Sequence, residues 1–159
     1  MKVTPASILV MRHAEKPRSP IDPHLSEAGR RRAERLAAWL PETFGRPDIL
    51  FAAADKLLSH RPRETLEPLA SATGAPLRHD VSDKRSEAFA GELLADPEYA
   101  GRRVVVAWRH KALPGLARAL GAEAGECPDP WPGELYDLIL RFDYAEGAKP
   151  EVTALTMPF

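Results

Sequence analysis

Cysteine is nearly absent from this chain of 159 residues, in which Cys127 stands alone. A single cysteine excludes an internal disulfide and a metal cluster held by several thiolates. Long apolar runs are also missing, since no stretch approaches the ~20 residues that span a bilayer. Neither sign of charge dominates, because the formal net charge is −1. The overall charge therefore gives no electrostatic reason to expect nucleic acid as a partner.

Asparagine and glutamine do not occur, and arginine is far commoner than lysine. No function follows from this bias, which fits codon usage as well as it fits selection against thermolabile amides. The remaining composition is typical of a globular protein, with 44% hydrophobic and 28% charged residues. The first seven residues lack the pattern of a signal peptide. We expect one domain over residues 1–159, located in the cytoplasm and not bound to a membrane.

Apolar runs of strand length alternate along the chain with segments of helical periodicity. We expect strands at 7–11, 49–53, 76–78, 103–108, 135–142 and 152–157, and helices at 26–40, 65–72, 86–95 and 113–120. The last two strands are separated by a turn-rich segment, residues 146–150. The alternation predicts an α/β domain of three layers, α/β/α, with a mostly parallel central sheet.

Two of the predicted strands run directly into an arginine and a histidine. Arg12 and His13 follow the first strand, and Arg109 and His110 follow the strand at 103–108. The carboxyl ends of strands form the ligand-binding edge of an open α/β sheet. A neutral imidazole can attack phosphorus, and a guanidinium binds phosphate oxygens as a planar fork. Each pair also has a plainer interpretation, as a surface ion pair or a helix cap.

A third polar segment, Ser59 to Thr65, follows the second strand and opens a helix. Pro62 suits the first turn of that helix, and Thr65 is placed to satisfy free backbone amides. Arg63 is then expected to reach the same sheet edge as Arg12. Alone, the segment is also consistent with a solvated basic helix start. Because all three segments follow predicted strands, we expect Arg12, His13, Arg63 and His110 to share one pocket.

Together these segments resemble the histidine phosphatase superfamily, which includes phosphoglycerate mutases and many small phosphatases. The Arg-His-Gly signature of that family corresponds to Arg12-His13-Ala14, with alanine in place of glycine. Its Ser-x-x-x-Arg-x-x-Thr type of segment is similar to residues 59–65, and its second histidine matches His110. The run from Leu25 to Arg30 is similar to its Leu-Thr-x-x-Gly segment. The resemblance covers about residues 7–120, with the four elements in the family's order.

The resemblance implies a phosphoglycerate mutase-like fold and a phosphatase that needs neither metal nor cofactor. It makes His13 the nucleophile, which would form a phosphohistidine intermediate. Arg12 and Arg63 become phosphate clamps, and His110 becomes the second histidine of the phosphate pocket. The implied partner is a small-molecule phosphate ester or a phosphoprotein. Lys16, Arg109 and Lys111 would make the rim of the pocket basic, which suits an anionic substrate.

The proton donor for the leaving group is left open by the sequence. Family members often carry a glutamate just past the strand that is similar to residues 76–78, where this chain has His79 and Asp80. The candidate carboxylates are Asp80, Glu15, Asp83 and Glu87. Such an acid is needed for an alkoxide leaving group and less so for a better one.

Two alternative functions remain beside the phosphatase. A phosphoglycerate mutase-type phosphotransferase is less favoured, because the segments between the site elements are short. A catalytically weak module that binds phosphate or phosphoprotein would keep the pocket without turnover. Hydrolysis of p-nitrophenyl phosphate without added metal separates these classes. The five histidines show no HExxH-type spacing, so we expect no metal site. The run at 30–32 lies among glutamates and is interpreted as a solvated, salt-bridged helix face.

Overall fold

A computed structural model describes residues 4–145 and 149–159 of the chain. Its centre is one six-stranded sheet with the strand order β3-β2-β4-β1-β5-β6. The strands are β1 (Ser7–Arg12), β2 (Ile49–Ala53), β3 (Leu77–Val81), β4 (Arg103–Trp108), β5 (Leu138–Asp143) and β6 (Glu151–Thr156). The first four are parallel, β5 pairs antiparallel with β1, and β6 pairs antiparallel with β5. The expected class, α/β with a mostly parallel sheet, is confirmed.

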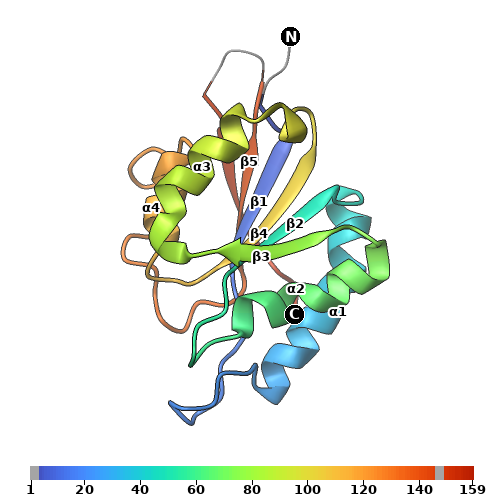
Figure 1. Ribbon diagram of the computed structural model, residues 1–159, viewed down its shortest axis with the longest axis vertical. Helices are drawn as coiled ribbons and strands as arrows, with labels where there is room; N and C mark the ends of the chain where they lie inside the picture. The colour runs from blue at the N-terminus through green and yellow to red at the C-terminus, as the bar shows by residue number, and fades with distance from the viewer. Residues whose placement is uncertain (1–3, 146–148) are drawn as a thin grey trace.

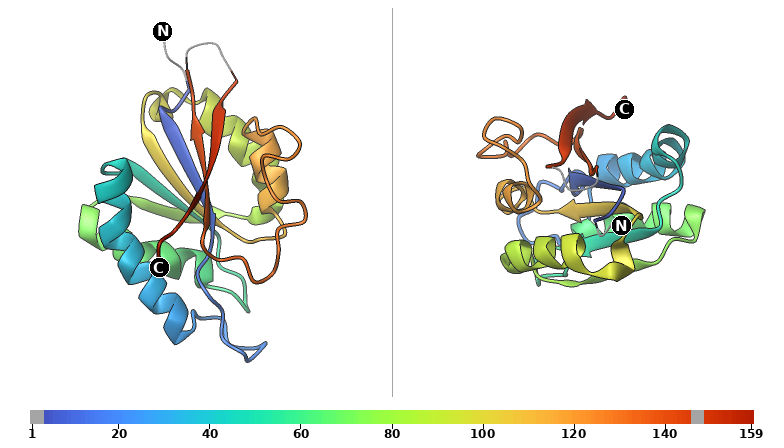
Figure 2. Two further views of the ribbon diagram at one scale, coloured as in Figure 1. Left: turned by 180° about the vertical axis from the view of Figure 1, so that it is seen from behind. Right: turned by 90° about the horizontal axis from the view of Figure 1, so that it is seen from above.

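Two pairs of helices cover the two faces of the sheet. One face carries α1 (Glu27–Phe44) and α2 (Arg61–Thr73), and the other carries α3 (Ser86–Ala95) and α4 (Leu113–Ala119). Short 3₁₀ turns, Asp83–Arg85 and Pro97–Tyr99, flank α3. Figure 1 labels these elements, and the view from above in Figure 2 shows the sheet between its helical layers. The predicted three layers are therefore present.

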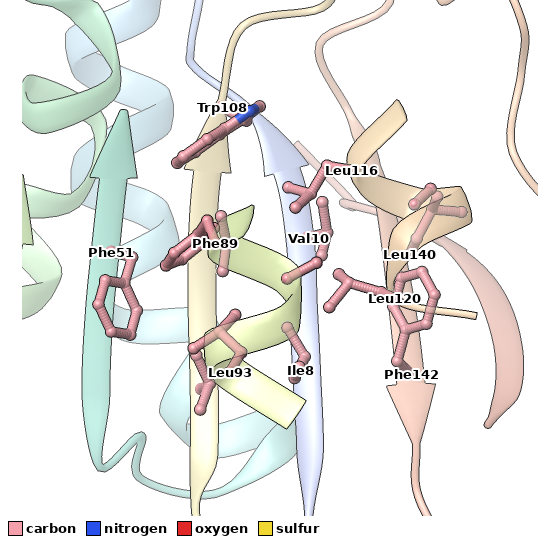
Figure 3. Packing of buried hydrophobic residues seen from close by; sticks show 14 of the residues in the cluster. Ile8, Val10, Phe51, Phe89, Leu93, Trp108, Leu116, Leu120, Leu140 and Phe142 are labelled. Atoms are coloured by element: carbon pink, nitrogen blue, oxygen red, sulfur yellow. The ribbon is translucent and has the colours of Figure 1, made fainter. Parts of the chain in front are cut away.

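The central strand β1 is apolar on both faces because each face packs against a helical layer. Ile8 and Val10 belong to the core beneath α3 and α4, whereas Leu9 and Met11 belong to the core beneath α1 and α2. Alternate residues of a strand point to opposite faces, so the run Ile-Leu-Val-Met fills both cores at once. Figure 3 shows Ile8 and Val10 among the larger side chains of the first core.

The carboxyl ends of β1 and β4 lie side by side. The register pairs Arg12 with Trp108, and the backbone N–H of His13 donates to the Trp108 carbonyl at 3.0 Å. Trp108 is fully buried and stacks on Phe89, with ring centroids 5.1 Å apart. Its indole Nε1 donates to Ser86 Oγ at 2.9 Å, so its one polar atom is satisfied. Trp108 is therefore a buried, fully satisfied side chain at the end of β4, directly before Arg109.

Several element boundaries differ from the sequence-based expectation. Pro41 does not end α1, which continues through it to Phe44 and closes at Gly45, where φ is +89°. A helix survives an internal proline when other contacts outweigh one lost N–H bond, and α1 packs Leu36 and Leu40 into the core. Strand β3 runs over 77–81 rather than 76–78, and β5 begins at Leu138 rather than Leu135. The expected turn at 146–150 lies partly outside the described residues.

The helices of the described residues contain no segment that is both long and apolar enough to cross a lipid bilayer.

Candidate active site

A cavity of about 220 Å³ opens at the carboxyl ends of β1 and β4, beside the start of α2. Its lining combines two histidines, one carboxylate and six cationic side chains: His13, His110, Asp83, Arg12, Lys16, Lys56, Arg61, Arg109 and Lys111. A cavity with this excess of positive charge favours an anion.

His13 is held as a neutral imidazole with one nitrogen free. Its side chain is buried, and Nδ1 lies 2.6 Å from the carbonyl oxygen of Ala14. A carbonyl only accepts, so Nδ1 carries the proton and Nε2 keeps its lone pair. Burial is the main cause that lowers the pKa of His13 to about 3, and the cations of Arg12, Arg61 and Arg109 act in the same direction, against the hydrogen bond to the Ala14 carbonyl. At neutral pH His13 is therefore an unprotonated imidazole, and its Nε2 lone pair can act as a nucleophile.

Arg12 lies beneath the cavity with its charge largely removed from water. Its Nη1 donates to the carbonyl of Gly133, and its guanidinium carbon lies 4.1 Å from the centre of the Tyr136 ring. Burial is the main reason that the pKa of Arg12 is lowered, and Arg61 lowers it further. The buried Nε has no hydrogen-bond partner among residues 4–145 and 149–159. Arg12 also belongs to the lining of the cavity, where its positive charge favours an oxyanion.

Arg61, and not Arg63, is the arginine that α2 contributes to the cavity. Arg63 pairs instead with Asp55 and Glu67, each at 3.0 Å, and does not belong to the lining that the described residues form. Arg61 is the first residue of α2, and a helix turns about 100° per residue. Two residues later the side chain therefore points about 200° away. The expectation that Arg63 shares the pocket is thus wrong.

The guanidinium of Arg61 is tied to the surrounding loops. Nη1 donates to the carbonyl of Asp22 at 2.9 Å, and Nη2 lies 3.3 Å from that of Leu58. Its Nε is buried and, like that of Arg12, lacks a partner within the described parts of the chain. Burial and the neighbouring Arg109 lower the pKa of Arg61. Arg61 and Arg12 thus bring two guanidinium groups to the lining of the cavity, and a guanidinium suits a tetrahedral anion.

The first turn of α2 is joined directly to the end of β1. Thr65 Oγ1 donates to the Arg61 carbonyl at 2.7 Å and accepts the backbone N–H of Ala14 at 2.8 Å. We expected Thr65 to satisfy amides of its own helix, and it serves the backbone after His13 instead. This bridge fixes the distance between Ala14, the residue after His13, and the turn that carries Arg61.

Gly29 allows the start of α1 to contact the segment that follows His13. A Cβ at this position would lie 2.4 Å from the Glu15 carbonyl oxygen, so any larger residue would push the two backbones apart. Ser26 caps the helix by accepting from the Gly29 N–H at 3.0 Å, and its own N–H donates to Glu15 O at 2.9 Å. The run from Leu25 to Arg30 therefore positions the segment after β1.

Arg109 and Asp83 form a buried pair on the far side of the cavity. Arg109 donates to Ser59 through Nε and Nη2, at 3.2 Å and 2.8 Å, and its Nη1 lies 3.4 Å from Asp83 Oδ2. Lys56 lies 3.0 Å from Asp83 Oδ1. The sequence predicted Arg109 only as part of the basic rim. Its pairing with Asp83, 26 positions away, could not be predicted from a local motif.

His110 lines the same cavity as His13, as expected. It is partly exposed, and burial together with the charge of Arg12 lowers its pKa. The neutral form again predominates, so one ring N–H is available to an anion. Lys16 and Lys111 also line the cavity, as the predicted basic rim requires.

The four candidate acids occupy different places. Asp83 lines the cavity, and Glu87 lines an adjoining groove of about 770 Å³ between α3 and α4. This groove shares Asp83, His110 and Lys111 with the cavity. Asp80 lies in a separate pocket beside Phe51, and Glu15 forms an ion pair with Arg32 at 2.9 Å. Asp80 and Glu15 therefore do not lie in the described lining of the cavity.

Comparison with known proteins finds similarity at the level of three-dimensional structure. Neither a protein-family model nor a curated protein sequence matches the chain. The putative phosphohistidine phosphatase SixA from Agrobacterium tumefaciens superposes with a TM-score of 0.63 at 21% identity, over 96% of this chain and 98% of that chain.

Two structures solved with bound oxyanions are similar as well. The mycobacterial glucosyl-3-phosphoglycerate phosphatase Rv2419c, in complex with inorganic phosphate, has a TM-score of 0.64 at 19% identity over 96% of both chains. The protein histidine phosphatase SixA, complexed with tungstate, has a TM-score of 0.59 at 17% identity, over 94% of this chain and 96% of that chain. These proteins belong to the histidine phosphatase superfamily. The phosphoglycerate mutase-like fold that the resemblance implies is thus confirmed.

Proposed function

We propose that this protein is a phosphatase that hydrolyses a phosphomonoester or a phosphoprotein through a phosphohistidine on His13, without metal or cofactor. The observation that carries the proposal is the unprotonated His13, with Nε2 free, in a cavity lined by six cationic side chains. A neutral nucleophile beside fixed positive charge is what attack on a phosphoryl dianion requires. The cytoplasm remains the expected location.

In the first step, Nε2 of His13 attacks phosphorus as the bond from phosphorus to the leaving oxygen breaks. The leaving oxygen takes a proton from an acid or from water. In the second step, water attacks the phosphohistidine, which releases inorganic phosphate and returns the electron pair to Nε2. The water proton passes to the group that donated one earlier, so each turnover begins from the same state.

The cations stabilise the charge that spreads over the phosphoryl oxygens during transfer. The guanidinium groups of Arg12 and Arg61 line the cavity, and His110 offers a ring N–H. Fixed donors already in place need little reorganisation as the transition state forms. The similar structures solved with phosphate and with tungstate support an oxyanion as the ligand.

The adjoining groove between α3 and α4 is the proposed site of the leaving group. It shares His110 with the cavity and has a volume of about 770 Å³, larger than a phosphate needs. An open groove beside a small phosphate cavity favours release of the leaving group over its retention. A mutase-type phosphotransferase must retain its intermediate, so this shape favours hydrolysis.

His13→Ala is expected to abolish hydrolysis of p-nitrophenyl phosphate and the formation of an acid-labile phosphoryl adduct, because the lost Nε2 is the proposed nucleophile. Release of p-nitrophenol and phosphate measures turnover. Mass spectrometry of the protein after rapid mixing, without an acid quench, detects the phosphoryl adduct. His79→Ala, at an exposed histidine on β3, is the matched control and should keep both. Near-normal turnover in His13→Ala contradicts the mechanism. Oxyanion binding without turnover in the unmodified protein would favour the binding module.

Stability should depend on pH through His13. Its pKa is about 3 in the folded protein and about 6.5 when unfolded, so only the unfolded chain takes up the proton between these values. As pH falls from about 6.5 toward 3, the native state should lose up to about 1.4 kcal/mol per pH unit on this account. Denaturant unfolding of the wild type and His13→Ala at several pH values measures the difference. Parallel pH dependence in the two proteins would show that His13 is not held neutral by burial.

Arg61→Ala should lower kcat/KM on the order of 10²–10³-fold, because it removes one electrostatic stabiliser of the transition state. Arg63→Ala is the matched control from the same helical turn, and it should change kcat/KM by less than about threefold because its ion pairs are on the surface. Initial rates with p-nitrophenyl phosphate measure both. A larger loss in Arg63→Ala than in Arg61→Ala would restore the original assignment and refute the present one.

Asp83 and Glu87 should respond differently to the leaving group. Asp83 already pairs with Arg109 and Lys56, so Asp83→Asn is expected to slow aryl and alkyl phosphates by similar factors by misplacing those cations. Glu87 lies in the groove, so Glu87→Gln should slow alkyl phosphates by about 10²-fold and spare p-nitrophenyl phosphate, which needs no acid. Rates of each variant with both substrate types test this. If Asp83→Asn is the selective variant, Asp83 is the acid, and if neither is selective, water donates the proton.

A further inference from the structure

A second group of potential ligands lies on the other side of the α2 start. His24 belongs to the loop between β1 and α1, His60 directly precedes α2, and Glu64 lies in the first turn of that helix. One donor atom from each residue lies within 4.8 Å of the other two. The lining that the described residues give to the His13 cavity includes none of the three. This cluster is therefore separate from the proposed active site.

Helical spacing and loop conformation bring the three side chains together. His60 and Glu64 are four residues apart, and the Glu64 N–H donates to the His60 carbonyl at 3.1 Å, so both side chains lie on one face. His24 Nδ1 is 2.7 Å from Glu64 Oε2. The His24 and His60 rings meet edge to face, with centroids 5.4 Å apart.

Three hydrogen bonds from backbone N–H groups position the cluster, and none of them uses the atoms proposed to bind the ion. The His60 N–H donates to the Pro23 carbonyl at 2.8 Å, and the His24 N–H donates to Asp22 Oδ1 at 3.0 Å. Glu64 Oε1 accepts the Leu25 N–H at 3.0 Å, which leaves Oε2 directed at His24. A carboxylate oriented in this way by a backbone donor is a common feature of metal sites.

We propose that His24, His60 and Glu64 form a binding site for Zn²⁺. Two imidazoles and one carboxylate are a donor set that suits zinc, whereas Mg²⁺ and Ca²⁺ prefer oxygen ligands alone. Bonds of ~2.0–2.1 Å to a tetrahedral ion need donors ~3.3 Å apart. The His24–Glu64 pair, at 2.7 Å, has to open slightly, and the remaining donor distances, which are at most 4.8 Å, have to close. The His24 side chain is 55% exposed, so water has access to the fourth position.

Zinc would replace the hydrogen bond between His24 and Glu64. The proton on Nδ1 of neutral His24 moves to Nε2, which frees the Nδ1 lone pair, and the ion then lies between Nδ1 and Oε2. No net proton is released from a neutral imidazole in this exchange. The bound ion would link the loop at 22–25 to the first turn of α2. Arg61, in that turn, already contacts the loop by donating to the Asp22 carbonyl.

Calorimetric titration of the chelator-treated full chain with ZnCl₂ at about pH 7.5 tests the site, because an ordinary imidazole is neutral there. We expect one Zn²⁺ per chain, with affinity lowered about 10–100-fold or more in His60→Ala and in Glu64→Gln. Glu64→Gln keeps an oxygen for the Leu25 N–H, so the loop contact is preserved. His79→Ala is the matched control and should bind as the wild type does. Substitution with Co²⁺ should give visible d–d bands in the wild type and not in His60→Ala.

Two results would overturn the assignment. One is the absence of saturable binding up to ~1 mM Zn²⁺, which corresponds to less than about 4 kcal/mol of binding free energy. The other is binding that persists unchanged in His60→Ala and Glu64→Gln and disappears in His13→Ala, which would place the ion in the cavity. Thermal unfolding of every variant in chelator shows whether each is folded, so loss of binding is not confused with loss of structure. This inference is independent of the proposed phosphatase activity.

Discussion

The site depends on the parallel pairing of β1 with β4 in the middle of the sheet. Their register ends with Arg12 opposite Trp108, and the N–H of His13 continues the ladder by donating to the Trp108 carbonyl. Two segments almost 100 positions apart therefore deliver their histidines to one edge. The pairing is secured from both sides, because β1 contributes buried side chains to both cores.

The electrostatic character of the cavity follows from burial more than from any single pair. Arg12, Arg61 and Arg109 all have pKa values lowered mainly by desolvation, and His13 is neutral for the same reason. Of these arginines, Arg109 is the one with a carboxylate partner, Asp83, among the residues of the cavity lining. The Nε groups of Arg12 and Arg61 are buried and have no hydrogen-bond partner among the described residues. The arrangement is costly for the empty protein and favourable once a dianion is bound.

Periodicity and strand order were sufficient to predict much of the fold and part of the site. The strand at 103–108 and the helix at 86–95 were predicted with their observed bounds, because uninterrupted apolar periodicity leaves little choice of register. The choice between Arg61 and Arg63 depends on the residue at which α2 begins, and an error of a few positions there turns the helix to another face. The roles of Asp83 and Thr65 depend on contacts between loops far apart in sequence, which local patterns do not encode.

The first turn of α2 is the element that connects the two proposed sites. Arg61 leaves it toward the cavity, whereas His60 and Glu64 leave it toward His24. Thr65, one residue further, holds the backbone after His13. A helix presents successive residues about 100° apart, so a single turn is enough to serve three directions. The loop at 22–25 contacts this turn through Asp22, Pro23 and Leu25. A ligand that orders this loop therefore acts on the same helical turn that brings Arg61 to the cavity of His13. Binding at the surface cluster is thus connected to the phosphate cavity through directly contacting residues.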